Sequence, residues 1–191
     1  MLKESVKKLQ ADSNIVIRKF EFKDIEEKVR IINDKENNKY LHYDLPLEYE
    51  KTIDWFNKNV NNKKRNDFTI EYNNEVAGFI GLLNIDEKNL KAEYYICVDN
   101  KFTRKGIAYN SSLLLLKYAF NEKKLNKVYL YTEAENIKAQ ALFEKLKFRK
   151  EGLFKDDLIY NEKKIYRYAY GICKDDFYGY DFNWKDKWKY K

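Results

Sequence analysis

Strand-like and helix-like patterns alternate along the second half of this chain, and their order constrains the fold more than any other feature. After a strand-like run at 91–98, the pattern changes to a helix that opens at Gly106. The remaining segments are a short strand at 127–132, a helix at 136–147, and closing strands at 148–154 and 163–173. Strands that alternate with helices favour a sheet with parallel neighbours and helices packed on it.

The start of the chain supplies one strand and two helices. Alternating apolar residues predict a strand at 15–22, after a charged leader. Asp24 is placed to cap a helix that runs to Asn33. Residues 34–47 are expected to form a loop before a second helix at 48–60.

A predicted hairpin joins the two halves. The strand-like runs 67–72 and 75–85 flank Asn73 and Asn74, and asparagine tolerates the positive φ that a tight hairpin turn requires. Taken in order, the segments predict an α/β fold: a single three-layer domain with a mixed central sheet flanked by helices.

The length and the composition suit one domain with a short appendage. The 191 residues contain only six glycines and one proline, which excludes fibrous and low-complexity classes. We expect the domain to occupy 1–174 and an aromatic-rich tail to occupy 175–191. Such a tail is expected to pack on the domain or on a second subunit, so a homodimer is one arrangement that it allows.

The charge of the chain restricts its partners. Thirty-eight basic and 31 acidic side chains give a net charge of +7, which permits an anionic ligand. The basic residues are dispersed among acidic ones, which disfavours a nucleic-acid partner. The apolar run 113–116 is far too short to cross a membrane, and the start of the chain is charged rather than signal-like. We therefore expect a cytoplasmic protein that does not contact membranes.

The chain has a single histidine, His42, which excludes a multi-histidine metal site. Its two cysteines lack the spacing of metal ligands and are expected to be reduced. Catalysis would depend on carboxylates, tyrosines, backbone amides or a bound cofactor.

The junction between strand 91–98 and the next helix has the features of an anion site. Unpaired backbone N–H groups and the positive end of a helix dipole attract anions, and Gly106 allows close backbone approach. Arg104 and Lys105 oppose that dipole unless an anion offsets them, so this junction predicts a ligand that carries phosphate. The alternative is an ordinary helix start with two surface cations.

Two motifs in this region resemble the GNAT superfamily of acetyl-CoA-dependent N-acetyltransferases, over about residues 14–174. The pyrophosphate signature of the family aligns Thr103, Gly106 and Ala108, although its first position is usually Gln or Arg. The second match runs from Asn136 to Phe148 and resembles the Asn-x-x-Ala-x-x-Leu-Tyr-Glu-Lys-x-Gly-Phe segment of the family. Phe143 replaces the usual tyrosine of that segment, and Lys147 replaces its glycine.

The resemblance implies acetyl-CoA as co-substrate and direct attack of an amine on its thioester. It assigns cofactor binding to the backbone of Ile96, Cys97 and Val98 and to the side chain of Asn136, with Phe143 at the position of the departing thiolate. The pyrophosphate is expected to lie over Arg104, Lys105, Gly106, Ile107 and Ala108.

The resemblance also implies a catalytic base and an acceptor pocket. Glu93 lies where related enzymes often carry the residue that takes the amine proton; the alternative is a surface ion pair, for example with Lys91. Tyr40, His42, Tyr43 and Trp55 lie where the family forms its acceptor pocket, although packing in the core is the alternative for each.

Neither the residues nor the resemblance identifies the acceptor amine. We expect a primary amine of a small molecule, for example a nucleotide-linked amino sugar. The alternatives are a polyamine or the N-terminus of a ribosomal protein as acceptor, and a non-catalytic regulatory domain that binds acetyl-CoA.

Overall fold

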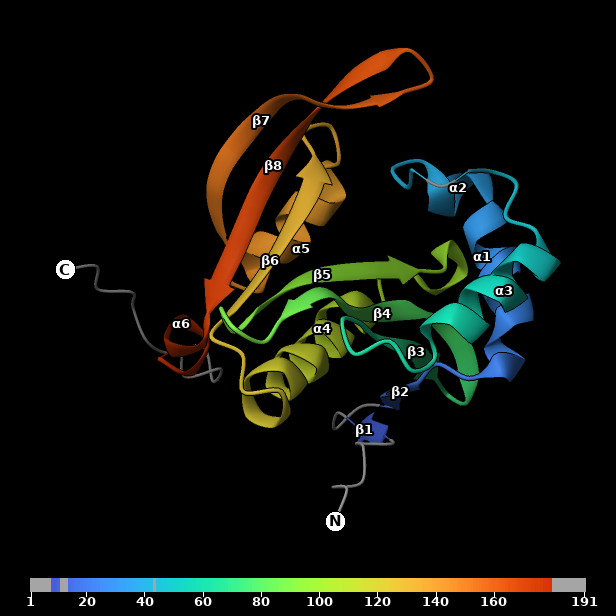
Figure 1. The fold of residues 1–191 in the computed structure, drawn as a ribbon, viewed down its shortest axis with the longest axis horizontal. Helices are drawn as coiled ribbons and strands as arrows, with labels where there is room; N and C mark the ends of the chain where they lie inside the picture. The colour runs from blue at the N-terminus through green and yellow to red at the C-terminus, as the bar shows by residue number, and fades with distance from the viewer. Residues whose placement is uncertain (1–7, 11–13, 43, 180–191) are drawn as a thin grey trace.

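A computed structural model describes residues 8–10, 14–42 and 44–179 of the chain (Figure 1). Its centre is an eight-stranded sheet in the order β1-β2-β3-β4-β5-β6-β8-β7. The strands are β1 (Lys8–Gln10), β2 (Ile15–Lys19), β3 (Asn66–Tyr72), β4 (Glu75–Asp86), β5 (Lys91–Val98), β6 (Lys127–Glu133), β7 (Arg149–Tyr160) and β8 (Lys163–Cys173). The helices are α1 (Ile25–Asn33), α2 (Lys35–Asn38), α3 (Tyr49–Asn59), α4 (Ile107–Lys117), α5 (Ile137–Lys145) and α6 (Lys174–Tyr178).

Helices cover both faces of this sheet, which confirms the predicted three layers. On one side, Ile80 and Leu82 of β4 pack in the main core with Leu115 of α4 and Phe143 of α5. We call this side the α4 face. On the other side, Phe79 of β4 packs in a smaller core with residues of α1 and α3, and we call this side the α1 face. Successive side chains of a strand alternate between the two faces.

The pairing of β5 with β6 interrupts an otherwise antiparallel sheet. These two strands are parallel, and their register extends over only three residues, ending where Glu93 pairs with Tyr129. Beyond Glu93, β5 remains paired with β4 as far as Val98. The two strands therefore diverge, and the edge of β5 that faced β6 is left free from Tyr94 onward.

The predicted hairpin is confirmed, and its cause is local. Asn73 and Asn74 have φ of 51° and 66°, and they join β3 to β4 with Tyr72 opposite Glu75. Asparagine adopts this left-handed conformation more readily than most other residues. The turn chemistry therefore determines where β3 and β4 begin to pair.

Several sequence-based boundaries were wrong. Strand β2 ends at Lys19 rather than at residue 22, and β1 lies within the segment expected to be a leader. The segment 34–47 contains the short helix α2, which Asp34 caps by accepting hydrogen bonds from the amides of Glu36 and Asn37. Strand β7 continues to Tyr160 rather than ending near 154, because bulges between Phe154 and Leu158 bend the strand without ending it.

Asp24 does not cap α1 through its side chain, contrary to the prediction. Its carboxylate is buried and pairs with both terminal nitrogens of Arg18 at 2.7 Å, and it also accepts a hydrogen bond from the Thr69 hydroxyl. Burial opposes ionisation, but these hydrogen bonds outweigh it and lower the pKa of Asp24 below its usual value. Asp24 therefore ties the start of α1 to β2 and β3.

The described part of the predicted tail packs on the domain. Phe177 of α6 is buried, and its ring lies 5.1 Å from that of Phe120. Residues 180–191 lie outside the described residues. The boundary at 174 and the homodimer stay predictions. Within the described ranges, no helix is both long and apolar enough to cross a membrane.

Candidate active site

A cleft of about 480 Å³ opens where β5 and β6 diverge. On the α4 face, its walls include Tyr94, Ile96 and Val98 of β5 and Phe143 of α5. On the α1 face, they include Glu93, Cys97, Tyr131, Glu133 and Arg167, together with Tyr40 and His42 from the segment after α2. Because the gap lies within the sheet, two reactants can approach each other from opposite faces.

The free edge of β5 contains the three residues expected to bind the arm of the cofactor. Ile96, Cys97 and Val98 line the cleft, and their register partners on β4 are Ile80, Phe79 and Gly78. Backbone donors and acceptors of a strand lie in the plane of the sheet, and β6 does not pair with this part of β5. An extended polar chain can therefore pair with β5 as an added strand would.

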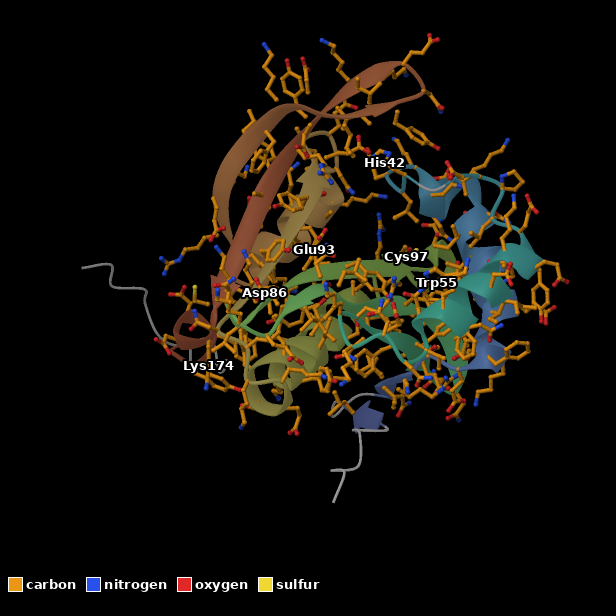
Figure 2. All side chains as sticks on the ribbon, in the orientation of Figure 1. His42, Trp55, Asp86, Glu93, Cys97 and Lys174 are labelled. Carbon is orange, nitrogen blue, oxygen red and sulfur yellow. The ribbon has the colours of Figure 1, made fainter. Side chains whose placement is uncertain are left out.

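Figure 2 shows Glu93 and Cys97 along the same strand and His42 near α2. Trp55 is a residue of α3 and lies near Cys97 in this view, and both pack against the smaller core of the α1 face.

The helix junction has the backbone geometry of an anion site. Gly106 precedes α4 with φ of 73°, and Arg104 has φ of 62°, so both residues are left-handed. Such a turn leaves the first amides of a helix of 11 residues directed outward. Thr103 and Ala108 line the cleft next to this turn. The junction fits a pyrophosphate.

The side chains of this junction are not equivalent. Ile107 is 1% exposed and belongs to the main core, so only its backbone can contact a ligand. The Lys105 ammonium lies 5.2 Å from the centre of the Tyr72 ring and 5.4 Å from that of Phe102. Arg104 has no ion pair among the described residues. Arg104 is therefore the side chain best placed to contribute charge.

Helix α5 supplies two further predicted residues. Asn136 caps α5 by accepting a hydrogen bond from the Ala139 amide at 3.2 Å, and this leaves its side-chain N–H groups available to the cleft. Phe143 is 5% exposed and lies 5.9 Å, ring to ring, from each of Tyr94, Phe148 and Tyr170. Phe143 therefore contributes an apolar wall.

Glu93 lies at the point where β5 and β6 separate, on the α1 face of the cleft. Its carboxylate accepts a hydrogen bond from the Asn84 side chain at 2.8 Å. Lys91, the alternative partner, lies 5.9 Å from the centre of the Tyr129 ring instead. A half-exposed carboxylate held by a neutral amide can accept a proton from a reactant in the cleft.

The segment after α2 crosses to the far side of the cleft. His42 Nε2 lies 3.0 Å from Glu133 Oε1, and the His42 ring lies 4.9 Å from that of Tyr160 in the β7–β8 hairpin. The Tyr40 hydroxyl donates to the backbone oxygen of Glu135 at 3.4 Å. Tyr43 lies outside the described residues. Tyr40 and His42 are therefore brought to the cleft by contacts with β6 and the hairpin.

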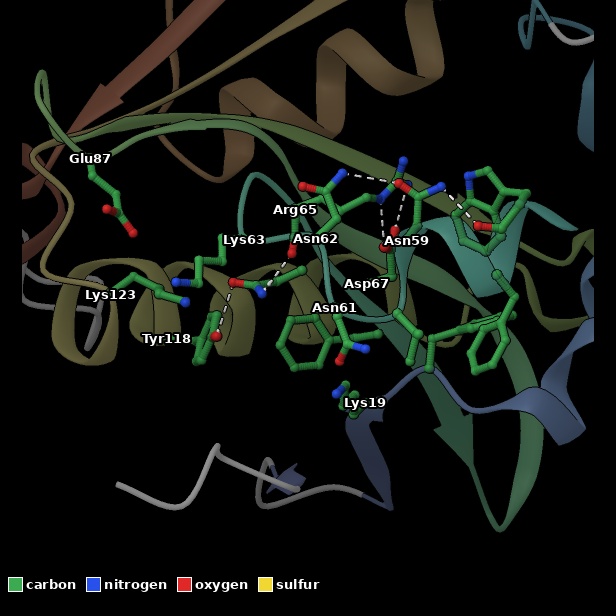
Figure 3. A pocket seen from close by; sticks show the side chains of 16 residues that line it. Lys19, Asn59, Asn61, Asn62, Lys63, Arg65, Asp67, Glu87, Tyr118 and Lys123 are labelled. Carbon is green, nitrogen blue, oxygen red and sulfur yellow. Dashed lines mark hydrogen bonds and ion pairs between the residues drawn. The ribbon is translucent and has the colours of Figure 1, made fainter. Parts of the chain in front are cut away.

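Trp55 is the predicted acceptor-pocket residue that the structure does not bring to the cleft. It packs against Phe20 with ring centres 5.7 Å apart, in the smaller core of the α1 face. It lines a separate cavity of about 440 Å³, which Figure 3 shows beside Asn59, Arg65 and Asp67. The geometry therefore supports a packing role for Trp55 in the smaller core, which was the alternative to a role in the acceptor pocket.

The other reactive side chains near the cleft are poorly suited to covalent chemistry. Burial raises the pKa of Cys97 to about 12, so its thiol is protonated at neutral pH. Tyr94 is fully buried, its hydroxyl is 2.6 Å from that of Ser112, and burial raises its pKa. The Tyr95 hydroxyl donates to Asp67, away from the cleft. Direct transfer needs no nucleophile from the protein.

Sequence reasoning missed Glu133 and Arg167. Glu133 is the third of the alternating residues Tyr129, Tyr131 and Glu133, whose side chains lie opposite the core residues Val128 and Leu130. That alternation was visible in the sequence, but the partner of Glu133 is His42, 91 positions earlier. The pairing could not be found without the fold.

A sheet split beside a helix N-terminus, with a free strand edge on one side and a carboxylate on the other, suits a transferase, because it can hold a phosphate-bearing acyl donor and an amine together. Residues 14–149 match the acetyltransferase (GNAT) domain, and the chain belongs to this family. It is an N-acetyltransferase that uses acetyl-CoA as the acetyl donor.

Curated relatives and solved structures agree with this assignment. The spermidine N(1)-acetyltransferase of Escherichia coli (strain K12) is 28% identical over 77% of this chain and 80% of its own length. A second relative is YdaF of Bacillus subtilis (strain 168), which is named as a putative ribosomal N-acetyltransferase. It is 27% identical over 89% of this chain and 97% of its own length. The spermidine N-acetyltransferase of Vibrio cholerae, solved with CoA and spermine, superposes with a TM-score of 0.81 at 23% identity, covering 86% of this chain and 98% of that one.

Proposed function

We propose that this N-acetyltransferase acetylates a primary amine of a linear polyamine, by direct attack of the amine on the acetyl-CoA thioester. Two relatives point to amine acceptors of different size: a spermidine N(1)-acetyltransferase and a protein named for a ribosomal acceptor. The charge of the cleft favours the first.

The observation that carries this proposal is the charge on the α1 face of the cleft. Glu36, Glu93 and Glu133 line it, although the chain as a whole has a net charge of +7. Among the described residues, the basic side chains that line the cleft are Lys138, Arg167 and His42; Arg167 is paired with Asp157, and His42 is paired with Glu133. A polycation is attracted by such a lining, whereas a nucleotide-linked amino sugar would find few cations for its phosphates.

Each step of the reaction has a candidate group in this chain. The free edge of β5 and the turn at Gly106 orient the acetyl donor, while the α1 face holds the amine. Glu93 accepts the proton of the attacking amine, directly or through a water molecule. A backbone N–H of Ile96, Cys97 or Val98 stabilises the negative oxygen that develops on the thioester carbonyl.

The departure of the thiol needs little help. A thiol has a pKa near 8.5, so it leaves readily as its anion. The absence of a tyrosine at Phe143 therefore lowers the rate without preventing the reaction. The proton that Glu93 takes from the amine is later released to solvent.

The test is turnover of acetyl-CoA, followed by the release of free CoA thiol. The panel contains spermidine, spermine, a nucleotide-linked amino sugar and peptides that begin like ribosomal proteins. We expect turnover with the polyamines and at most slow turnover with the others. Turnover with only a peptide or only the amino sugar would overturn the polyamine assignment and leave the family assignment intact.

A further inference from the structure

Glu93 and Glu133, two of the carboxylates on the α1 face, lie at different points along the split between β5 and β6. Glu93 pairs in register with Tyr129, and Tyr129, Tyr131 and Glu133 alternate along the same face of β6. Glu133 lies four positions beyond Tyr129, which places its Cα about 13 Å further along the strand. This separation is comparable to the length of an extended triamine such as spermidine, and it exceeds that of a short diamine.

Glu133 has an incomplete set of partners. Its side chain is 13% exposed, and Oε1 is held by His42 at 3.0 Å. Within the part of the chain that the structure describes, no hydrogen bond reaches Oε2. Burial raises the pKa of Glu133, and His42 partly offsets this. A half-satisfied, largely buried carboxylate is stabilised by a cation placed at its free oxygen.

The basic groups nearest to Glu133 do not fill this position. Arg167 is the register neighbour of Glu133 on β8, but its guanidinium is hydrogen-bonded to Asp157. Arg167 also lies 4.9 Å from the centre of the Tyr131 ring. His42 is fixed from its other side by the ring of Tyr160. The fold therefore presents Glu133 to the cleft with His42 on Oε1 only, while Arg167 attracts the carboxylate through its charge but is hydrogen-bonded to Asp157.

We propose that Glu133 binds the distal ammonium of the acceptor while Glu93 receives the proton of the reacting amine. This inference rests on the proposed polyamine function and adds a length requirement to it. The acceptor lies along β6, past Tyr131, which lines the cleft and whose ring lies 5.9 Å from that of Tyr129. Aromatic rings in this position can contact both the methylene groups and the charges of a polyamine. Glu133 is a specificity-determining residue, separate from the proton transfer at Glu93.

The test compares E133Q with the wild-type enzyme, using spermidine and the shorter diamine putrescine as acceptors. Loss of a charged hydrogen bond should raise the KM for spermidine about 10- to 100-fold, with little change in kcat. The ratio of kcat/KM for spermidine to that for putrescine should fall by a similar factor. A residue with only a structural role would lower both activities together and leave this ratio unchanged.

E135Q is the matched control, because it removes an equal charge in the turn that follows β6, outside the lining of the cleft. E133D retains the charge on a shorter side chain and should give an intermediate KM. The thermal midpoint and the CoA affinity of E133Q should remain at wild-type values.

Two results would overturn the inference: an unchanged spermidine KM in E133Q, or an equal rise in E133Q and E135Q. If the wild-type enzyme acetylates no polyamine, the proposed function itself fails. That result is distinct, because it appears before any variant is made.

Discussion

The ammonium of Lys28, a residue of α1, lies 3.4 Å from the centre of the Trp55 ring, which belongs to α3. Arg65 approaches the same ring at 4.8 Å, so cations contact Trp55 from two elements. Lys28 is 8% exposed, and it has neither a hydrogen bond nor an ion pair among the described residues. Burial lowers the pKa of Lys28 from its usual 10.5 to about 8. This packing explains why Trp55 belongs to the core and not to the acceptor pocket.

We expect Lys28 to make the stability of the fold depend on pH. Between pH 8 and 10.5 the unfolded chain keeps the Lys28 proton while the folded chain releases it. The unfolding free energy therefore rises with pH across this window, by up to about 3 kcal/mol from this residue alone. Below pH 8 the cost of burying the charge is present in full.

The measurement is denaturant unfolding of the wild-type protein and of K28M, over pH 7 to 11. Methionine fills a similar volume without a charge, so the difference between the two curves isolates Lys28. As pH rises from 8 to 10.5, the unfolding free energy of the wild type should increase relative to that of K28M. Parallel curves would show that Lys28 does not lose its proton in this range.

E93Q tests the assigned base. We expect kcat to fall by about 10² to 10⁴, with CoA affinity little changed, because glutamine cannot accept the amine proton. The defect should lessen at higher pH, where more of the acceptor amine is already neutral. Steady-state kinetics across pH, with E135Q as the charge-matched control, would check this. Wild-type activity of E93Q at every pH would exclude Glu93 as the base.

Gly106 is expected to permit backbone approach to the pyrophosphate. G106V places a branched side chain at φ of 73°, and its Cβ would lie 3.3 Å from Asn110 Nδ2. We expect weaker CoA binding in titration calorimetry, together with a stability loss of about 1–2 kcal/mol from the left-handed backbone. Unchanged CoA affinity in G106V would show that the pyrophosphate does not bind at this turn.

Arg104 allows the charge and the backbone to be tested separately. R104E keeps a side chain at φ of 62° but reverses its charge, so CoA affinity should fall, and it should fall less at high salt. R104G also loses the charge but relieves the left-handed strain, so its unfolding free energy should rise by about 1 kcal/mol while affinity falls. Equal affinity in both variants and the wild type would show that Arg104 does not contact the cofactor.

Phe143 lines the cleft where relatives of this family place a tyrosine, and it is surrounded by Tyr94, Phe148 and Tyr170. We expect F143Y to leave kcat unchanged or to raise it, because the added hydroxyl can protonate the departing thiolate. Single-turnover kinetics would separate this step from product release. A large fall in kcat with intact CoA affinity would show that the site requires a dry apolar wall.

Local chemistry made much of this fold predictable. The asparagine pair at 73–74, the alternation in 91–98 and the glycine that opens α4 each act within a few residues, so the sequence was sufficient to locate them. The error at the end of β7 has the opposite cause. Its charged segment Lys155-Asp156-Asp157 has the composition of a turn, but pairing with β8 on either side holds it in the sheet as a bulge.

The sequence by itself determined most of the order of strands and helices, and it predicted an anion-binding junction at Gly106. These depend on backbone propensity and on residues that are close along the chain, whereas the candidate base Glu93 was proposed from the resemblance to the GNAT family. Only the tertiary structure decided where β5 and β6 separate, that Trp55 packs between Lys28 and Arg65, and that His42 lies beside Glu133. Such contacts join residues that are ten to about ninety positions apart, and they depend on which faces are buried together. Periodicity shows that a residue faces one side of its strand, but it does not show which distant side chain it meets there.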